Sequence, residues 1–198
     1  MYNLGHPLIN SKEVVLNSIV FKESEFKVLT GSNMSGKSTF LRSIGINILL
    51  ANMGSVCFAT EMTYKPIKLI TSMRNNDSVL SKESYFMAEV NRLRFVFEKL
   101  KTEKVFLLLD ELLKGTNSED KLEGSRIILQ KLLGLHQQGI IATHDLELCN
   151  MESSYPSQIQ NICFESEIIE DTIHFDYKLK PGICKNKSAS FLIMKYIN

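Results

Sequence analysis

Residues 31–39 read Gly-Ser-Asn-Met-Ser-Gly-Lys-Ser-Thr and decide the fold of this 198-residue chain. The stretch satisfies the pattern Gly-x-x-x-x-Gly-Lys-Ser, and it stands between a short apolar run, 26–30, and a segment of helical character. Glycines let such a turn curl until its backbone amides point at phosphate oxygens, and the following helix directs its positive end to the same place. The sequence therefore predicts a P-loop between a strand and a helix.

Two side chains of this loop carry specific chemistry. Lys37 supplies a point charge for the β- and γ-phosphates of a nucleotide, and the Ser38 hydroxyl is a natural magnesium ligand. The other loop residues are expected to bind the nucleotide through their backbone amides: Gly31, Ser32, Asn33, Met34, Ser35, Gly36 and Thr39. ATP and Mg²⁺ are therefore the expected cofactors.

An acidic pair follows a second apolar run, 104–109. Asp110 ends this predicted strand, where its carboxylate can reach the magnesium shell through water, and Glu111 can polarise a water for attack on the γ-phosphate. Alone, such a pair is more often a helix cap or a solvated pair. Together with the loop at 31–39, it is interpreted as the metal-binding and catalytic half of the site.

A histidine follows the third apolar run, 139–143. His144 stands in the sequence Ala-Thr-His-Asp, at the carboxyl end of a predicted parallel strand, where open α/β sheets bind their ligands. A single histidine is usually structural or exposed. Because His144 would share one sheet edge with Lys37 and Asp110, it is predicted to sense the γ-phosphate.

The alternation of apolar runs with helical segments is typical of an α/β fold with a parallel sheet between helices. Apolar residues at helical spacing predict a helix over 84–101, and Asn117 is expected to cap another that ends near 137. Alternating apolar and polar residues in 173–179 predict an antiparallel strand paired with 159–168. A short helix over about 187–197 would close the domain.

Composition limits the remaining choices. The 23 basic and 22 acidic residues nearly balance, which argues against this segment being the main DNA-binding surface. The four cysteines have no metal-type spacing and are interpreted as buried thiols of a reducing compartment. No apolar run is long enough to span a membrane, so no membrane partner is expected. The length suits one domain over 1–198, expected to be soluble and cytoplasmic.

Other nucleotide-binding classes fit less well. A GTPase would have Gly where this chain has Leu113, and it would have an Asn-Lys-x-Asp motif, whereas Asn186-Lys187 continues with Ser and Ala. A small-molecule kinase would have an arginine-rich lid, and the five arginines of this chain do not cluster. An ATPase of another class is therefore favoured.

Four segments taken together closely resemble the ATPase domain of the MutS mismatch-repair family. They are the loop at 31–39, Glu-Ser-Tyr-Phe-Met-Ala-Glu-Val at 83–90, Leu-Leu-Leu-Asp-Glu-Leu-Leu-Lys-Gly-Thr-Asn at 107–117 and Ala-Thr-His-Asp at 142–145. Gly-His-Pro at 5–7 and the run at 177–183 also look like the flanks of that domain. The likeness covers nearly the whole chain.

The resemblance implies an ABC-type ATPase in which two copies of the domain face each other and complete each other's sites. Ser84, which is otherwise a plain helix cap, would then reach the γ-phosphate held by the partner. The loop at 114–118 would lie at the same interface. Binding of ATP would draw the two copies together, hydrolysis would release them, and turnover is expected to be slow in the isolated domain.

Some positions depart from the family pattern. Ser32 and Ser35 replace a Pro and a small residue, which a cradle of backbone amides tolerates. The family stacks adenine on an aromatic residue shortly before an Asn that matches Asn17, and the corresponding position here is Val14. Valine can pack against a base but has no ring to stack on it, so a weaker or less selective hold on adenine is expected.

The resemblance also implies that the chain is the C-terminal part of a longer protein. The family's mismatch-recognition, connector, lever and clamp domains, through which it contacts DNA, are absent from these residues. The expected function is that of an ATP-hydrolysing motor domain in DNA mismatch repair. Two alternatives stay open: a nucleotide-gated dimerisation module with little turnover, and the ATPase of a MutS-like protein that acts in recombination control.

Overall fold

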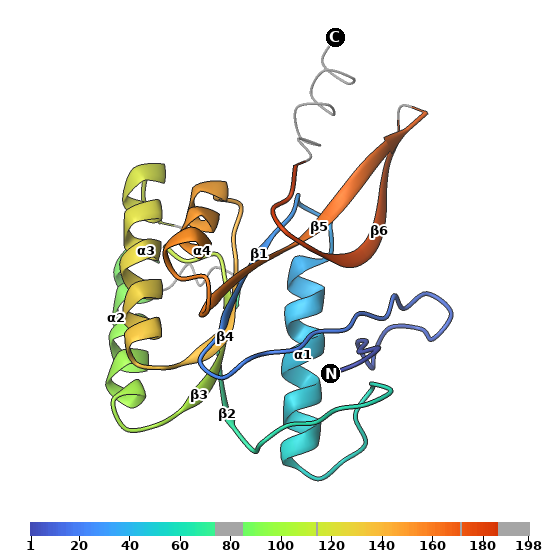
Figure 1. The fold of residues 1–198 in the computed structure, drawn as a ribbon, viewed down its shortest axis with the longest axis horizontal. Coiled ribbons are helices and arrows are strands. Elements are labelled where there is room, and N and C mark those ends of the chain that lie inside the picture. Colours follow the sequence, from blue (N-terminus) through green and yellow to red (C-terminus); the bar gives the residue numbers. More distant parts are fainter. Residues whose placement is uncertain (74–84, 114, 171, 186–198) are drawn as a thin grey trace.

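The computed structural model describes residues 1–73, 85–113, 115–170 and 172–185, and within them it forms an α/β fold. The elements in chain order are β1 (Phe26–Thr30), α1 (Lys37–Asn52), β2 (Lys68–Ser72), α2 (Tyr85–Leu100), β3 (Val105–Asp110), α3 (Ser118–Gly134), β4 (Gln138–Ala142), the 3₁₀ helix η1 (Leu146–Asn150), α4 (Met151–Ser154), β5 (Ile159–Ile169) and β6 (Thr172–Pro181). Figure 1 shows the sheet between α1 on one side and the remaining helices on the other.

One mixed sheet organises the described residues. Its six strands lie in the order β2-β3-β4-β1-β5-β6. The neighbouring strands run parallel except β5 and β6, which form an antiparallel hairpin. Strand β4 therefore lies between β1, which leads into the glycine-rich loop (residues 31–38), and β3, which ends at Asp110. This order brings the ends of three chain segments to one edge of the sheet.

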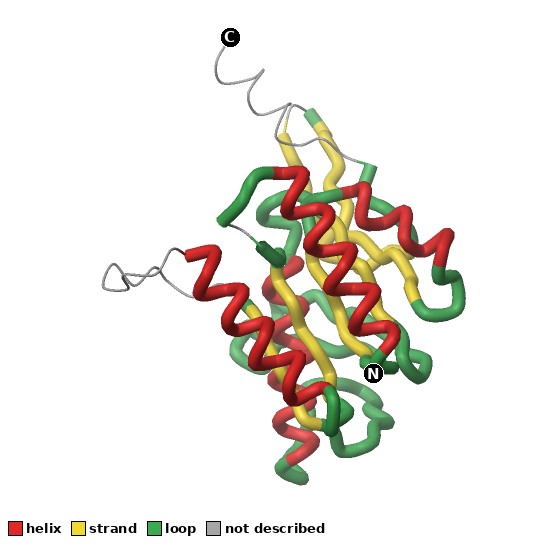
Figure 2. The backbone as a smooth tube through the Cα atoms, turned by 90° about the vertical axis from the view of Figure 1, so that its left-hand side faces the viewer, coloured by secondary structure: helices red, strands yellow, loops and turns green. Residues whose placement is uncertain are grey.

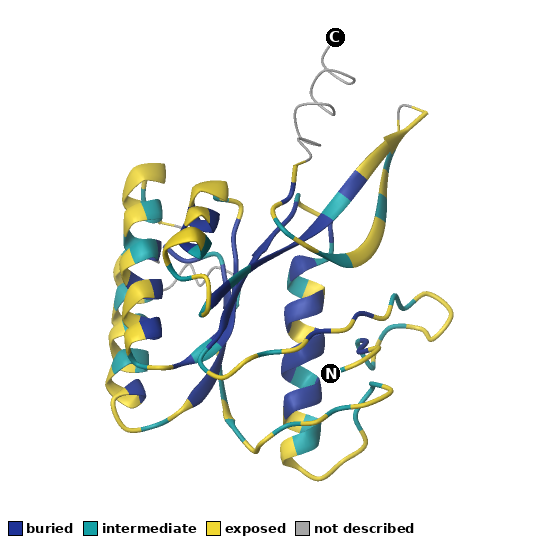
Figure 3. Cartoon of the chain, viewed as in Figure 1, coloured by how far each residue is buried: buried dark blue, intermediate teal, exposed yellow. Residues whose placement is uncertain are grey.

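Continuous apolar runs make the central strands because both of their faces are covered. Every residue of β1 and β3 is buried, and Figure 3 shows the buried residues concentrated in the central strands and along the inner side of α1. On β3, Leu107 and Leu109 belong to the cluster that contains α3, whereas Phe106 and Leu108 belong to the cluster that contains α1. The alternation follows from the two-residue repeat of a strand.

The two faces of the sheet are covered unequally. Figure 2 shows α2 and α3 side by side over one face. Helix α3 contributes five buried residues to the core, Ser125, Ile128, Leu129, Leu132 and Leu133. Among residues 86–100 of α2, only Leu100 is buried. The apolar side chains before it are half-buried or exposed. Helix α2 is therefore anchored chiefly at its C-terminal end.

The N-terminal segment lies across α1 and is held there by a buried amide. The Asn47 side chain is fully buried; its Nδ2 donates to the Gly5 carbonyl at 3.0 Å, and its Oδ1 accepts from the Phe58 amide at 2.6 Å. A buried amide with all its groups paired rigidifies its surroundings. The segment before β1 thereby becomes a wall of the site described below.

Most predicted elements are confirmed. The strands expected at 26–30, 104–109 and 139–143 are β1, β3 and β4, the helix expected at 84–101 is α2, and the expected hairpin is formed by β5 and β6. Asn117 caps α3, since its Oδ1 accepts from the Asp120 amide at 2.9 Å. The helix expected at about 187–197 falls outside the described residues.

One expectation needed correction, and one strand was missed. Helix α3 ends at Gly134 and not near 137, because His136 adopts a left-handed conformation (φ 52°), which commonly terminates a helix. Strand β2 was not predicted. Its sequence, Lys-Leu-Ile-Thr-Ser, has no long apolar run, and its residues are half-buried or exposed because β2 is an edge strand.

The cysteines are free thiols, and Cys149, Cys163 and Cys184 are buried as expected, whereas Cys57 is half-buried. Burial raises the pKa of Cys149 to about 12 and that of Cys163 to about 11, so both remain protonated near neutral pH. Among the described helices, none has both the length and the apolar character that crossing a membrane requires.

Strand β4 leaves no room for a side chain beside β3 at Gly139. A Cβ at this position would lie 2.1 Å from the Leu107 carbonyl oxygen. Gly139→Ala should therefore lower the free energy of unfolding by about 2 kcal/mol or more, as overpacking does elsewhere. Gly134→Ala is the matched control, because nothing lies within 4 Å of an added Cβ there, and it should change stability by about 0.5 kcal/mol or less. Chemical denaturation of both variants measures the difference; equal effects would contradict a close contact at Gly139.

Candidate functional site

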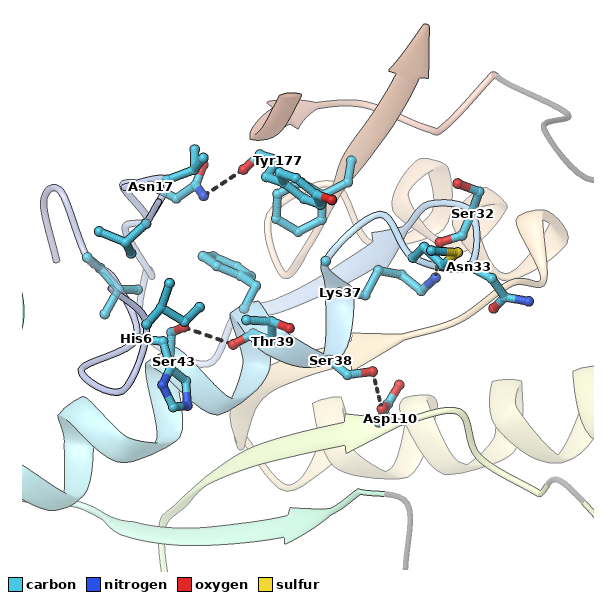
Figure 4. Close-up of a pocket in the computed structure, with 18 of the residues that line it drawn as sticks. His6, Asn17, Ser32, Asn33, Lys37, Ser38, Thr39, Ser43, Asp110 and Tyr177 are labelled. Carbon is cyan, nitrogen blue, oxygen red and sulfur yellow. Dashed lines mark hydrogen bonds between the residues drawn. The ribbon is translucent and has the colours of Figure 1, made fainter. Parts of the chain in front are cut away.

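A cavity of about 620 Å³ opens above the carboxyl ends of β1, β3 and β4. Its walls come from the N-terminal segment, the glycine-rich loop, the start of α1 and β6 (Figure 4). The predicted site residues that line it are Val14, Asn17, Ser32, Asn33, Met34, Gly36, Lys37, Ser38, Thr39, Asp110, Glu111 and His144. Gly31 and Ser35 do not line it, and Ser84 falls outside the described residues. These predicted residues come from four separate parts of the sequence and meet in one place.

The glycine-rich loop turns sharply before α1. Gly36 has φ 99° and Met34 has φ 68°, and the first of these conformations is readily available only to glycine. No side chain caps the N-terminus of α1, which begins at Lys37. The first amides of that helix therefore need acceptors from outside the helix, a need that an anion can meet.

The Lys37 ammonium lies inside the glycine-rich loop. Its Nζ donates to the carbonyl oxygens of Gly31 at 2.7 Å and Ser32 at 2.9 Å, and it lies 3.3 Å from His144 Nε2. Burial lowers the pKa of Lys37, and the nearby carboxylates of Glu111 and Asp110 oppose that shift. Lys37 is a positive charge held almost out of water at the base of the cavity.

Ser38 and Asp110 place two side-chain oxygens next to each other. The Ser38 hydroxyl donates to Asp110 Oδ2 at 2.8 Å, which joins the start of α1 to the end of β3 (Figure 4). Within the described ranges, no group of three or more His, Cys, Asp and Glu side chains could hold a metal ion. A site with only two protein oxygens suits Mg²⁺, because this ion usually keeps several waters and binds substrate phosphates.

Glu111 and His144 interact beside this pair. Glu111 Oε1 lies 3.2 Å from His144 Nε2, the same nitrogen that lies 3.3 Å from Lys37 Nζ. Burial, and next the charge of Lys37, lower the pKa of His144 against the opposing effect of Glu111, so the imidazole is neutral at pH 7. A neutral Nε2 either donates to Glu111 or accepts from Lys37, and the tautomer decides which.

The turn that carries Glu111 is strained. Glu111 has φ 54° and Leu113 has φ 57°, and such conformations cost about 1–3 kcal/mol for residues other than glycine. The Glu111 amide donates to the Ala142 carbonyl at 2.9 Å, and the Leu113 amide donates to Glu89 Oε1 on α2 at 2.8 Å. Sequence reasoning missed Glu89, since an acidic residue on an amphipathic helix carries no local signal of this contact.

Asn17 joins the N-terminal segment to β6. Its Nδ2 donates to the Tyr177 carbonyl at 2.9 Å, and its Oδ1 accepts from the Leu179 amide at 2.7 Å. The Lys178 ammonium adds a contact to the Leu16 carbonyl at 3.2 Å. The amide of Asn17 is thus occupied by β6, and its part in the site is to position that strand.

Tyr177 is a second site residue that the sequence did not reveal. It lines the cavity together with Val14, and its ring stacks on Phe175 with 5.9 Å between centroids. A Cβ on Gly36 would lie 3.2 Å from Tyr177 Cδ1, so the ring reaches the glycine-rich loop (Figure 4). The alternating pattern of β6 was visible in the sequence, but the face that meets the loop depends on pairing with distant residues.

A family model and individual relatives point to the same protein family. The family description "MutS domain V" matches residues 27–195. The chain is 31% identical to the "MutS protein homolog 4" of Homo sapiens over 194 residues, which cover 92% of this chain and 20% of that protein. It is 34% identical to the "DNA mismatch repair protein MutS" of Thermotoga neapolitana over 182 residues, which cover 90% of this chain and 22% of that protein.

A plant relative gives the same picture. The "DNA mismatch repair protein MSH4" of Arabidopsis thaliana is 30% identical over 181 residues, which cover 89% of this chain and 23% of that protein. The chain spans about a fifth of the length of these relatives. Because the family match extends over most of the described fold and the site residues within it, this chain belongs to the MutS family, in which it corresponds to domain V, the ATPase domain.

Proposed function

We propose that this chain binds ATP with Mg²⁺ and hydrolyses it, as a P-loop ATPase of the ABC type. The observation that carries the proposal is the meeting of one buried cation, one hydroxyl and two carboxylates at the end of the cavity: Lys37, Ser38, Asp110 and Glu111. A phosphoryl-transfer site needs a cation, magnesium ligands and a group that orients water. Family membership supports the same activity.

The residues present fit a bound triphosphate. The Ser32 hydroxyl lines the cavity, is buried and has no hydrogen-bond partner among the described residues. Lys37 is bonded to neutral carbonyl oxygens of its own loop, and an anionic phosphate oxygen is a stronger acceptor for an ammonium. The uncapped start of α1 adds further donors. All these donors favour a polyanion.

Ser38 and Asp110 are the residues that would hold Mg²⁺, Ser38 directly and Asp110 through water. The ion supplies neutralisation of charge on the β- and γ-phosphate oxygens. The Ser38 hydroxyl now donates to Asp110, and turning this donor away would free its lone pairs for a metal. Lys37 adds a second positive charge at the phosphates.

Glu111 and His144 would act on the attacking water and the γ-phosphate. Glu111 accepts a proton from the water or orients it for in-line attack. His144 is neutral at pH 7, and in the tautomer with a proton on Nε2 it can donate a hydrogen bond to an oxygen of the γ-phosphate. Its contact with Glu111 links the γ-phosphate to the catalytic carboxylate.

Tyr177 and Val14 would contact the base. Val14 replaces the aromatic residue that is usual in the family, and Tyr177 offers a ring on another wall of the same cavity. Asn17 holds the backbone of β6 on both sides of Lys178, which keeps that ring at the cavity. Tyr177 thereby compensates for the stacking that Val14 lacks.

A second copy of the chain is the proposed partner. Met34 at the tip of the glycine-rich loop is 82% exposed, and Gly115 packs against the first turn of α2, where a Cβ would lie 3.0 Å from the Phe86 amide nitrogen. In a dimer whose sites face each other, these groups would meet the partner, and Ser84 would act in trans. At the level of the whole protein, the relatives' names support a role in DNA mismatch repair, with DNA bound by other domains.

Lys37→Ala should reduce ATP hydrolysis about 100-fold or more, because it removes the main charge that stabilises the transferred phosphoryl group. Lys101→Ala, at an exposed position directly after the end of α2, is the matched control. Steady-state hydrolysis by the purified protein is measured over a range of protein concentrations, because a site completed by a partner gives specific activity that rises with concentration. Equal rates for Lys37→Ala and the parent would refute the site.

Glu111→Gln separates the ATPase from a nucleotide-gated module. For an ATPase this variant should retain ATP binding and lose most hydrolysis, because it removes the carboxylate that acts on water. A parent protein that binds ATP without turnover would instead support the gated module.

Tyr177→Ala should weaken ATP binding about 5- to 150-fold, which corresponds to about 1–3 kcal/mol of stacking on one base. Tyr177→Phe keeps the ring and should bind like the parent. Inorganic triphosphate supplies the control ligand, because it has no base and its affinity should not change in Tyr177→Ala. Calorimetry measures all three; an equal loss for ATP and triphosphate would remove Tyr177 from the base site.

The pKa of His144 should respond to both of its neighbours. Lys37→Ala removes a positive charge that disfavours the imidazolium, so the pKa of His144 should rise. Glu111→Gln removes a negative charge that favours the imidazolium, so the pKa should fall further. The pH titration of the His144 ring proton by NMR, assigned with His144→Gln, reports both shifts. Shifts of the opposite sign would contradict the contacts described.

A further inference from the structure

The turn after β3 is held from three sides. Leu113, a bulky residue in a left-handed conformation, is an outlier that persists only where its surroundings fix it. Strand β4 holds the Glu111 amide through the Ala142 carbonyl, and α3 leaves room for the Leu113 side chain at Gly124, where a Cβ would lie 2.2 Å from Leu113 Cδ1. Helix α2 holds the Leu113 amide through the Glu89 carboxylate at 2.8 Å.

The contact from α2 to this turn is made by a charged side chain, that of Glu89. A carboxylate that accepts from a backbone amide makes a charge-assisted hydrogen bond, which is stronger than one between neutral groups. Glu89 is half-buried, which reduces the competition from water. The conformation of the turn, and with it the direction of Glu111, therefore depends on where α2 lies.

The first turn of α2 also packs against the far side of the turn. The contact between Gly115 and Phe86 is so close that an added Cβ would lie 3.0 Å from the Phe86 nitrogen. Phe86 and Glu89 are three residues apart and share one side of the helix. The N-terminal end of α2 is thereby joined to the chain on both sides of residue 114.

Helix α2 has room to shift. A cavity of about 420 Å³ lies between its middle and the sheet edge, lined by Leu93 and Phe97 of α2, Ile70 of β2 and Leu109 of β3. The one fully buried side chain within 86–100 is Leu100, at the opposite end from Glu89. Elements with few buried contacts move at low cost. Helix α2 is thus anchored at its C-terminal end and is underpacked in its middle.

We propose that Glu89 is a positioning residue through which α2 controls the orientation of Glu111. A displacement of the N-terminal end of α2 would pull the Leu113 amide and turn the catalytic carboxylate, so contacts at that end of the helix would regulate hydrolysis and leave nucleotide affinity unchanged. This inference rests on the proposed ATPase activity. It connects the N-terminal end of α2 to Glu111 within one chain.

The test compares Glu89→Ala, which removes the acceptor, with Glu89→Gln, which keeps an oxygen that can accept from the Leu113 amide. Glu98→Ala is the matched control, since Glu98 is exposed on the same helix and pairs with Lys101. In Glu89→Ala the kcat for ATP should fall about tenfold or more, and the KM and the Kd for ATP should stay within about twofold. Glu89→Gln should recover most of the kcat, and Glu98→Ala should behave like the parent.

Hydrogen exchange gives a readout that does not depend on activity. The Leu113 amide should exchange faster in Glu89→Ala than in the parent, and at nearly the parental rate in Glu89→Gln and Glu98→Ala. Thermal unfolding of each variant is measured as well, to detect any change in overall stability.

Three outcomes would overturn the inference or its basis. An unchanged kcat in Glu89→Ala overturns it while leaving the ATPase intact. A loss of ATP binding or of overall stability in proportion to kcat assigns Glu89 a merely structural role and also overturns it. A parent protein that hydrolyses no more ATP than Lys37→Ala refutes the proposed function, with which this inference falls.

Discussion

The register of three parallel strands determines the geometry of the site. Ala142 of β4 pairs with Leu29 of β1 on one side and with Asp110 of β3 on the other. Two residues beyond Ala142, His144 therefore emerges between the glycine-rich loop and the acidic pair. The close approach of β4 at Gly139 allows this alignment. A shift of one residue in β4 would invert its side chains and would move His144 away from Lys37 and Glu111.

Three kinds of contact then complete the site around this edge. Ser38 and Asp110 join α1 to β3, and Asn17 joins the N-terminal segment to β6. Glu89 joins α2 to the turn after β3. The residues proposed to bind phosphate lie at the edge of the central sheet, whereas Tyr177 and the turn after β3 depend on elements at its margins. The residues proposed to bind phosphate and those proposed to regulate hydrolysis thus depend on different elements of the fold.

The features that the sequence predicts correctly are those with local causes. The glycine-rich loop, the buried central strands and the Asn117 cap each follow from a few adjacent residues, and the structure has them at the expected positions. Strand β2 escaped prediction because its strand conformation comes from pairing with β3, not from its own composition. The roles of Glu89 and Tyr177 escaped for a related reason, since one depends on a left-handed turn 24 positions away and the other on Asn17, 160 positions away.

The separation of Asn17 and Tyr177 in the sequence affects the order in which the fold can form. The two bonds from Asn17 to β6 span 160 and 162 positions of the sequence. During synthesis the N-terminal segment emerges first, and its partner strand is among the last described elements to appear. Contacts between residues so distant in sequence form late, because bringing their ends together costs chain entropy before the contact stabilises the fold. A nascent chain can thus assemble the sheet edge that carries Lys37, Asp110 and His144 once β1, β3, β4 and β5 are made, but it acquires the wall beside Tyr177 only when β6 is complete, so the proposed nucleotide site closes at the end of folding.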